Sequence, residues 1–345
     1  MKNLFSKEIG LDLGTTNVRV YVRGAGLVVN DVSTISFNLR TQEPSCFGQE
    51  ALRMLGKTPQ HIRVIRPIEH GIISDFEATE LMLRLIFEKV RQKRSLFSTR
   101  PKIIAVIPLD ITEVERKSLE DVCAQIGSKK TFLVERPMAA AIGSRLPVSE
   151  PIGNLVGELG GGLVEIAIIS LNGIVAFKSL KLGGETLNNN LIDYVQEKFG
   201  IRLGMQTAEE AKNKLISAWP IKSQSMKVKG KDISTSLPRE IDLTDEDVRK
   251  ATINTLKTIV EAIKDTIDAA PTELVADIYK RGITLSGGLA LIPGFDKLIR
   301  QEINMPVHIA DDPLTAAIRG IGIILEDFKN LNGVLITPPK GEGLL

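Results

Sequence analysis

The chain has 345 residues, and its 44 lysines and arginines nearly balance its 42 aspartates and glutamates, which leaves a net charge of +2. This length corresponds to about two or three domains with ample room for a core, and the balanced charge excludes the strongly basic surface of a nucleic-acid-binding protein. Two cysteines indicate a reducing compartment. No run approaches the ~20 apolar residues of a membrane span, and charges come too early for a signal peptide, so we expect a cytoplasmic protein.

The first predicted unit is a strand–turn–strand hairpin at Ile9–Val22, IGLDLGTTNVRVYV. An apolar strand carries the acidic residue Asp12 near its end, and alternating apolar residues after the turn predict a return strand. The turn consists of small and polar residues, namely Gly14, Thr15, Thr16 and Asn17. Such a turn presents backbone N–H groups that a phosphate can approach closely.

Strands and helices alternate through the segment that follows, which predicts an α/β architecture. The predicted elements are short strands in Gly24–Asn38, a helix at Gly48–Leu55, a strand and turn in Arg63–Glu77 that lead into an amphipathic helix, a strand at Lys102–Pro108, a helix from Thr112 to Gly127, a strand at Thr131–Val134 and a helix from Pro137. Ser74 and Glu77 predict a capping box for the amphipathic helix.

The apolar pair Leu96 and Phe97 interrupts a basic stretch, VRQKRSLFSTRPK, that begins at Val90. One interpretation is a helix end with an apolar capping contact. The other is insertion of both side chains into a lipid interface while the basic neighbours contact anionic headgroups. The pattern leaves both interpretations open.

A second predicted hairpin, LVGELGGGLVEIAI at Leu155–Ile168, repeats the plan of the first about 146 residues later. Glu158 stands where the first copy has Asp12, and the turn is formed by Gly160, Gly161 and Gly162. A plain glycine hairpin is the alternative for one copy taken alone. Two copies that face each other would hold a polyphosphate between their backbone N–H groups, with the two acids positioning a hydrated cation.

The remainder continues the α/β pattern and contains two further candidate sites. The predicted elements are a strand at Gly173–Leu180, a helix after Gly183-Gly184, a helix at Thr207–Ser217, paired strands around Gly230 in Lys227–Ile241, helices at Asp245–Ile267 and Thr272–Arg281, a strand at Val307–Ala310 and a helix at Leu314–Leu325. Thr207 and Glu210 predict a capping box. Glu209 lies one turn before Lys212, as in an ordinary helical ion pair. Gly287-Gly288 suits either a simple turn or the close approach of a flat ligand.

The two hairpins resemble the phosphate-binding hairpins of the actin, hexokinase and seventy-kilodalton heat-shock ATPase superfamily, and the sequence from about Ile9 to Leu325 resembles the bacterial actin family MreB. The resemblance implies an α/β, actin-like fold with two related halves, each a mixed sheet flanked by helices, and a nucleotide in the cleft between them. The first half would span residues 1–150, with a smaller subdomain around 30–75. The second would span residues 151–345, with a smaller subdomain around 185–260. The lack of large insertions argues against a sugar kinase or a chaperone.

The resemblance also implies ATP and Mg²⁺ as cofactors, with Asp12 and Glu158 holding the ion through water. In the family a Glu-x-x-Lys pair contacts the nucleoside, a diglycine holds the adenosine, and an apolar pair placed like Leu96 and Phe97 inserts into the membrane. The implied nucleotide-binding residues are Gly14, Thr15, Thr16, Asn17, Gly160, Gly161, Gly162, Glu209, Glu210, Lys212, Gly287, Gly288, Leu289 and Ala290.

Two positions depart from the family pattern, in which a glutamate before Pro-Met-Ala-Ala-Ala and a threonine after the glycine turn orient and deprotonate the attacking water. Here they are Arg136 and Leu163, so the catalytic set becomes Asp12, Glu158, Arg136 and Leu163. Leu163 has no hydroxyl, and Arg136 cannot accept a proton at neutral pH. Arg136 either removes the general base or binds the γ-phosphate and retains ATP. Both interpretations predict slow hydrolysis.

The predicted function is therefore that of an ATP-binding bacterial actin homologue with weak hydrolysis. By resemblance it would form paired filaments with itself on the inner face of the cell membrane and influence cell shape. One alternative is an active ATPase or phosphotransferase of the same fold. Another is a regulatory subunit that copolymerises with another MreB.

Overall fold

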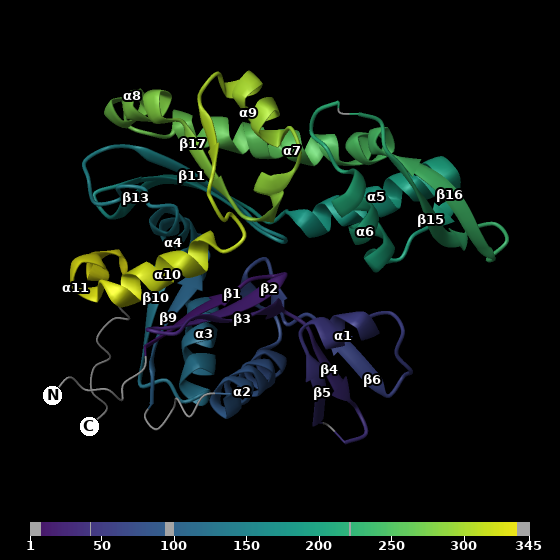
Figure 1. Cartoon of the computed structure of the whole chain (residues 1–345), viewed down its shortest axis with the longest axis horizontal. Helices are drawn as coiled ribbons and strands as arrows, with labels where there is room; N and C mark the ends of the chain where they lie inside the picture. Colours follow the sequence, from purple (N-terminus) through teal and green to yellow (C-terminus); the bar gives the residue numbers. More distant parts are fainter. Residues whose placement is uncertain (1–7, 42, 94–99, 221, 337–345) are drawn as a thin grey trace.

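The computed structural model describes residues 8–41, 43–93, 100–220 and 222–336 and shows two halves with helices between them (Figure 1). Each half contains a five-stranded sheet with a smaller, three-stranded sheet beside it. The predicted membrane residues Leu96 and Phe97 lie outside the described residues. Within the described ranges, none of the helices has both the length and the apolar content needed to cross a membrane.

The two five-stranded sheets have the same topology, which is the structural form of the duplication predicted from the hairpins. In each, an antiparallel meander of three strands is joined by two strands parallel to the first. The first sheet has the order β10-β9-β1-β2-β3, and the second has the order β13-β12-β11-β17-β18. The strands of the first are β1 (Glu8–Leu13), β2 (Asn17–Val22), β3 (Gly26–Val32), β9 (Lys102–Ile107) and β10 (Lys130–Glu135). Those of the second are β11 (Asn154–Leu159), β12 (Val164–Ser170), β13 (Gly173–Leu180), β17 (Ile283–Ser286) and β18 (Val307–Ile309).

Two helices, α4 (Arg136–Gly143) and α10 (Ala316–Glu326), form the layer between these sheets (Figure 1). Their apolar side chains pack in one cluster with residues from β9, β10, β11 and β12. The helices cross at glycines: a Cβ on Gly143 would lie 1.9 Å from the carbonyl oxygen of Ala316, and a Cβ on Gly320 would lie 1.8 Å from that of Ala139. The crossing therefore requires glycine at both positions.

Further helices cover the outer faces of the two sheets (Figure 1). On the first half these are α2 (Phe76–Lys93) and α3 (Glu113–Gln125), and on the second α7 (Asp245–Asp268), α8 (Thr272–Arg281) and α9 (Phe295–Ile303). Because both faces are covered, β1 and β11 are buried along nearly their whole length, as their apolar sequences predict. The last described helices are α11 (Phe328–Leu331) and the 3₁₀ turn Asn332–Val334.

Beside the first half lies the small sheet β5-β4-β6. Its strands are β4 (Ile35–Asn38), β5 (Glu43–Phe47) and β6 (Ile62–Ile65), and the helix α1 (Gln49–Met54) lies between β5 and β6 in the sequence. The two-stranded ladder of β7 (Ile68–Glu69) and β8 (Ile72–Ile73) follows and precedes α2. Asp75 Oδ1 accepts a hydrogen bond from Ala78 N at 3.0 Å and so caps α2. The capping box predicted from Ser74 is therefore wrong, because the Ser74 hydroxyl donates to the Pro67 carbonyl instead.

Beside the second half lies the small sheet β14-β15-β16. Its elements are α5 (Gly184–Phe199), β14 (Ile201–Arg202), α6 (Met205–Leu215), β15 (Ser225–Asp232) and β16 (Pro238–Thr244). Thr207 lies inside α6, which begins at Met205, so the capping box predicted from Thr207 and Glu210 is wrong. Gly230 lies within β15, and the hairpin turns after Asp232. Asp232 Oδ1 accepts four hydrogen bonds, from the backbone and hydroxyl groups of Ser234 and Thr235.

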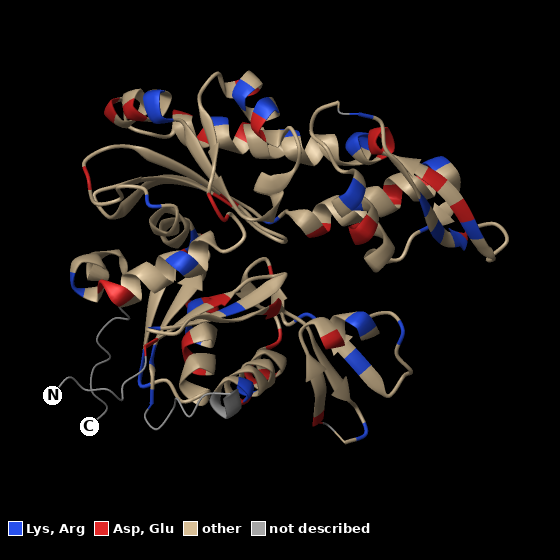
Figure 2. Cartoon of the chain, in the orientation of Figure 1, with Lys and Arg blue, Asp and Glu red and all other residues tan. Residues whose placement is uncertain are grey.

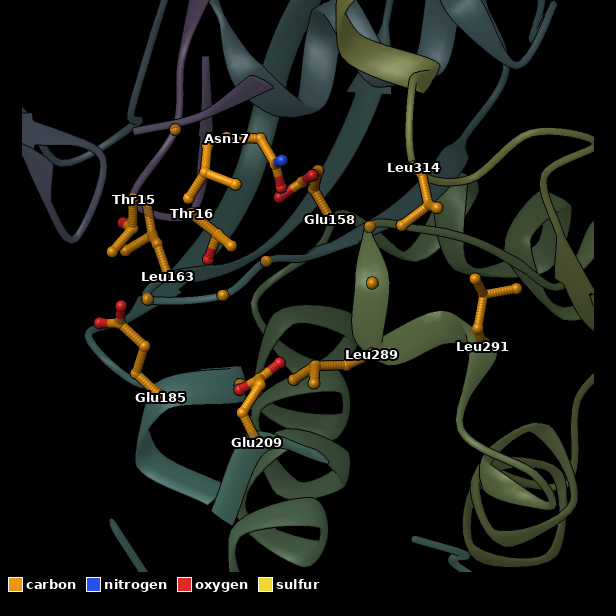
Figure 3. Close-up of a pocket in the computed structure, with 18 of the residues that line it drawn as sticks. Thr15, Thr16, Asn17, Glu158, Leu163, Glu185, Glu209, Leu289, Leu291 and Leu314 are labelled. Carbon is orange, nitrogen blue, oxygen red and sulfur yellow. The ribbon is translucent and has the colours of Figure 1, made fainter. Parts of the chain in front are cut away.

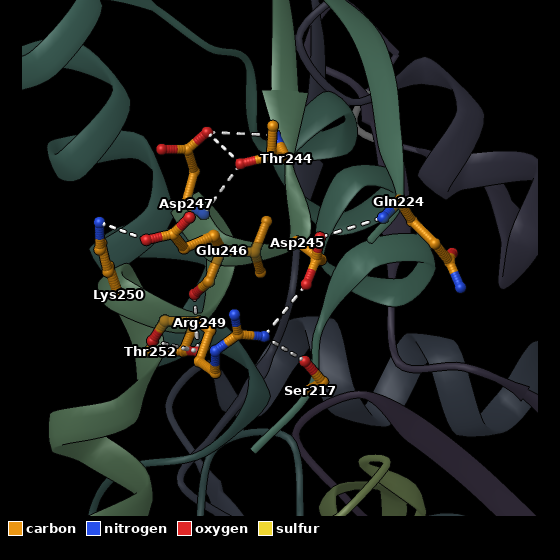
Figure 4. Close-up of polar contacts among 10 residues, drawn as sticks. Ser217, Gln224, Thr244, Asp245, Glu246, Asp247, Arg249, Lys250 and Thr252 are labelled. Carbon is orange, nitrogen blue, oxygen red and sulfur yellow. Dashed lines mark hydrogen bonds and ion pairs between the residues drawn. The ribbon is translucent and has the colours of Figure 1, made fainter. Parts of the chain in front are cut away.

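Ion pairs and hydrogen bonds of charged side chains connect the strands of this small sheet to each other and to α7. Lysines and acids interleave along the β15–β16 hairpin (Figure 2), where Lys227 and Lys229 both contact Glu240. At the start of α7, Asp245 accepts from the backbone of Gln224 and from Arg249, which also donates to Ser217 just after α6 (Figure 4). The ends of α6, β15 and α7 are thereby fixed against one another.

Candidate functional site

The tips of the two duplicated hairpins face each other across the cleft between the halves. A Cβ on Gly161 would fall 1.9 Å from Thr16 Oγ1, and a Cβ on Gly162 would fall 2.6 Å from the side chain of Thr15. Thr15 Oγ1 also accepts a hydrogen bond from Gly71 N at 2.9 Å. Only a turn without side chains allows this approach, which brings the backbone N–H groups of both turns to one place.

A cavity of about 630 Å³ opens between these tips and is lined by both halves. Its two ends differ in chemistry (Figure 3): the hairpin turns supply hydroxyls and backbone amides at one end, and Leu289, Leu291 and Leu314 lie toward the other. The first end suits a polyphosphate and the second a flat base. The lining residues predicted from the sequence are Gly14, Thr15, Thr16, Asn17, Arg136, Glu158, Gly160, Gly161, Gly162, Leu163, Glu209, Lys212, Gly287, Gly288 and Leu289.

Three predicted site residues are not among the described residues that line this cavity: Asp12, Glu210 and Ala290. Glu210 is exposed on α6, one position away from Glu209. Ala290 is buried in the core of the second half. Asp12 is 1% exposed and lies behind the residues of the cavity wall.

The predicted Glu209–Lys212 pair forms part of the cavity wall. Lys212 Nζ donates to Glu209 Oε2 at 2.9 Å and to the Gly184 carbonyl at 3.1 Å, and Glu209 also accepts from Asn188 and Asn213. Burial alone would raise the pKa of Glu209, but Lys212 and the amide donors outweigh it and lower that pKa. The pair is therefore held as an ion pair facing the cleft.

Asp12 forms the centre of a buried ion-pair cluster. Its Oδ1 accepts from Arg136 Nη1 at 2.8 Å, and its Oδ2 accepts from Arg19 Nη1 at 3.1 Å. Burial opposes the ionisation of Asp12, but the two guanidinium groups outweigh it and hold the pKa of Asp12 below its usual value. Arg136, the first residue of α4, also donates to the Leu13 carbonyl at 3.4 Å, and its Nε lies 4.0 Å from Glu165 Oε2.

The duplicated hairpins differ in their cross-strand partners. Asp12 lies opposite Arg19 in β1–β2, whereas the equivalent Glu158 lies opposite Glu165 in β11–β12. Burial raises the pKa of Glu158, and it raises the pKa of Glu165 to about 8. The guanidinium of Arg136 supplies positive charge near this acidic pair, so it interacts with both hairpins.

The two positions that would activate water by resemblance offer no proton acceptor. The side chain of Leu163 lies at the second hairpin tip near Thr15 (Figure 3), and the Arg136 guanidinium stays protonated. Glu135 precedes α4 as its N-cap residue, and burial raises the pKa of its carboxyl. Glu135 is not among the described residues of the cavity wall.

Three charged lining residues were missed by the sequence analysis: Arg19, Arg66 and Glu185. Arg66 Nη1 donates to Glu185 Oε1 at 2.6 Å, joining the end of β6 to the start of α5 across the cleft. The duplication itself could have indicated Arg19, because it occupies the place that Glu165 occupies in the second copy. The Arg66–Glu185 contact has no local signal, since the two residues are 119 positions apart.

Together the duplicated sheets and the cleft define a protein of the actin-like class. The structure is similar to that of MreB5 of Spiroplasma citri bound to ADP, with a TM-score of 0.90, 32% identity and coverage of 95% of this chain and 99% of that one. A structure of the same MreB5 bound to AMPPNP gives a TM-score of 0.90 at 33% identity, covering 94% of this chain and 97% of that one. The MamK double helical filament, at a TM-score of 0.78 and 17% identity over 93% of this chain and 99% of that one, supports the fold alone.

Sequence comparison places the chain within one family of that class. The family model described as MreB/Mbl protein matches residues 6–333. The cell shape-determining protein Mbl of Bacillus cereus is 37% identical over 329 residues, covering 95% of this chain and 98% of that relative. The cell shape-determining protein MreB of Escherichia coli is 38% identical over 330 residues, covering 94% and 95%. The chain belongs to the MreB/Mbl family, and the actin-like fold implied by the resemblance is confirmed.

The donor set does not fit a hydrated Mg²⁺ held by Asp12 and Glu158. Both carboxylate oxygens of Asp12 already accept hydrogen bonds from guanidinium groups. Asp12 also lies behind the described cavity wall, and burial disfavours the charged form of Glu158. Mg²⁺ prefers accessible, negatively charged oxygens. Asp12 offers no accessible oxygen, and Glu158 lines the cavity but lies where burial disfavours its charged form.

Proposed function

We propose that this chain is an ATP-binding, filament-forming actin homologue that takes part in determining cell shape. The polarised cleft supports this proposal, because it offers backbone amides for phosphates at one end and leucines for a base at the other. Its relatives Mbl and MreB are named as cell shape-determining proteins. Binding of ATP between the halves would favour the closed conformation over open ones and so bias the subunit toward assembly.

Hydrolysis in this proposal is weak. Hydrolysis of a nucleoside triphosphate depends on positioning the water and stabilising charge. Leu163 cannot hold a water by a hydrogen bond, and Arg136 is engaged with Asp12 rather than available as a base. Loss of a positioned general base commonly slows a reaction by about 10²–10⁴-fold. The nucleotide would therefore act by binding, and a Mg²⁺ ion that arrives with ATP would be held by the phosphates rather than by Asp12 or Glu158.

The proposed assembly is a paired filament of this chain, alone or together with another MreB, on the inner face of the membrane. The family supports self-association. Contact with lipid rests on the sequence, where basic residues flank Leu96 and Phe97.

The test measures ATP binding, phosphate release and sedimentation of filaments with the purified protein in one reaction. We expect filaments that pellet in the presence of ATP with negligible release of phosphate. Brisk release would show that another group activates water and would favour an active ATPase. Sedimentation that requires an added MreB partner would favour a copolymerising subunit.

A double variant tests the chemical reason for slow hydrolysis. Arg136→Glu with Leu163→Thr restores a proton acceptor and a hydroxyl, so we expect phosphate release to rise by about tenfold or more. Leu163→Thr alone is the matched control, because it adds the hydroxyl but no base. An unchanged rate in the double variant would contradict the assignment of the slow step to these two positions.

A further inference from the structure

We propose that the guanidinium of Arg136 takes over the charge-neutralising role of a divalent cation, so that the cleft binds ATP without requiring Mg²⁺. This inference rests on the proposed function of the cleft as an ATP site. It concerns how the site compensates the charge of the phosphates, and it makes the nucleotide-bound state insensitive to free Mg²⁺.

The first observation is the position of Arg136 among three carboxyl groups. Its Nη1 lies 2.8 Å from Asp12 Oδ1 and its Nε lies 4.0 Å from Glu165 Oε2. Glu158 is the cross-strand neighbour of Glu165 and interacts with Arg136 through its charge. A fixed cation thus occupies the place among the acids where a metal ion would be attracted.

The second observation is that the cation, not Asp12, faces the cavity. Arg136 and Arg19 both belong to the cavity wall, whereas Asp12 lies behind it. Asp12 is a single negative charge shared by two guanidinium groups. Asp12 and its two guanidinium partners, taken together, therefore carry one positive charge, which lies beside the turns whose amides suit phosphates.

The third observation is that further cations line the same cavity. Arg66 and Lys212 belong to its wall, each paired with one glutamate. The Nε groups of Arg19 and Arg66 are buried and have no hydrogen-bond partner among the described residues. Buried N–H donors without a partner are costly, and both side chains belong to a cavity wall whose turns suit phosphates, the groups that guanidinium ions bind strongly.

A merely structural ion pair is the competing explanation for Arg136. In that case the positive charge of Arg136 would only neutralise the neighbouring carboxyl groups, and ATP would still need Mg²⁺ to neutralise its phosphates. The pairing of Asp12 with Arg19 argues against it, because this carboxylate already has a partner on its own hairpin. The two explanations predict different effects of removing Mg²⁺ with a chelator: ATP binding persists if Arg136 replaces the ion, and it is lost if Arg136 is only a structural ion pair.

The test is calorimetric titration of the full chain with ATP in the presence of either Mg²⁺ or EDTA. We expect the two dissociation constants to agree within about threefold, which corresponds to well under 1 kcal/mol. Titration with Mg²⁺ alone should give no saturable binding. Binding of ATP only in the presence of Mg²⁺ would overturn the inference and leave the proposed function intact. Absence of ATP binding under both conditions would instead contradict the proposed function.

Two variants assign the effect to Arg136. Arg136→Gln removes the charge while keeping a polar side chain, and we expect about tenfold or greater loss of ATP binding in EDTA with partial recovery in Mg²⁺. Arg136→Glu changes the local charge by two units and should make binding depend on Mg²⁺. Arg202→Gln, at an exposed arginine of β14, is the control and should bind like the unmodified chain. Equal binding of Arg136→Gln and the unmodified chain in EDTA would overturn the inference, and the unmodified chain tests it even if a variant fails to fold.

Discussion

At the scale of single residues, buried ionisable side chains with few polar partners lie in the wall of the cleft and next to it, and Glu165 is the clearest case. Glu165 is fully buried on β12, its Oε1 accepts from Leu109 N at 2.6 Å, and its Oε2 has no hydrogen-bond partner among the described residues. The positively charged group closest to Oε2 is that of Arg136, whose Nε lies 4.0 Å away. This distance is too long for a hydrogen bond. Burial therefore dominates and raises the pKa of Glu165 to about 8.

This pKa predicts that the carboxyl of Glu165 destabilises the fold as the pH rises. Between its ordinary value of 4.5 and about 8, the folded chain keeps the proton and the unfolded chain loses it. The contribution of Glu165 to the free energy of unfolding therefore falls by up to ~1.4 kcal/mol per pH unit in this window. We expect Glu165→Gln, which cannot ionise, to gain stability relative to the unmodified chain between pH 5 and pH 8, measured by urea unfolding.

The control for this comparison is Glu210→Gln, which alters an exposed carboxyl outside the described cavity wall. Its stability should follow that of the unmodified chain at every pH. Parallel curves for Glu165→Gln and the unmodified chain would mean that Glu165 is ionised in the folded state.

At the scale of elements, the sequence predicted the types of the strands and helices well and their ends less well. The hairpins at β1–β2 and β11–β12 were predictable because apolar alternation, an acid and a glycine turn coincide. The start of α2 was misassigned because Ser74 and Asp75 are both good capping residues, and tertiary contacts with Pro67 decide between them. The crossing of α4 with α10 had no signal, because a glycine in an apolar helix does not reveal its partner.

That crossing gives a prediction about stability. A Cβ at residue 320 would meet the backbone of Ala139 rather than a movable side chain, so the two helices would have to separate. We expect Gly320→Ala to lower the free energy of unfolding by about 2 kcal/mol or more, measured by urea unfolding. Gly333→Ala is the matched control, since nothing lies within 4 Å of a Cβ there and the residue is exposed. A loss at residue 320 no larger than at residue 333 would show that α4 and α10 are not closely packed in solution.

At the scale of the whole molecule, the halves touch on both sides of the cavity as well as through α4 and α10. Arg66 pairs with Glu185, His70 Nδ1 lies 2.6 Å from the Gly162 carbonyl oxygen, and Gln206 Nε2 donates to the Leu52 carbonyl at 2.8 Å. The duplication predicted two halves and facing hairpins. It could not predict these contacts, because partners such as Leu52 and Gln206 are 154 positions apart and lie outside the repeated units.

The contact of Gln206 with α1 joins the two halves on the side of the smaller sheets, so we expect it to limit how often the cleft opens there. Gln206 Nε2 also lies 3.4 Å from the Leu55 carbonyl oxygen, so one amide spans the end of α1. Loss of a hydrogen bond of this kind costs about 1 kcal/mol, which corresponds to roughly fivefold more frequent opening. We therefore expect Gln206→Ala to accelerate amide hydrogen exchange in residues 48–56, with ATP slowing the exchange again by favouring the closed conformation. Gln196→Ala, at an exposed glutamine of α5, should leave this exchange unchanged. If Gln206→Ala exchanges as slowly in residues 48–56 as Gln196→Ala, the contact of Gln206 does not hold the cleft closed. Closure then depends on the contacts at Arg66 and His70.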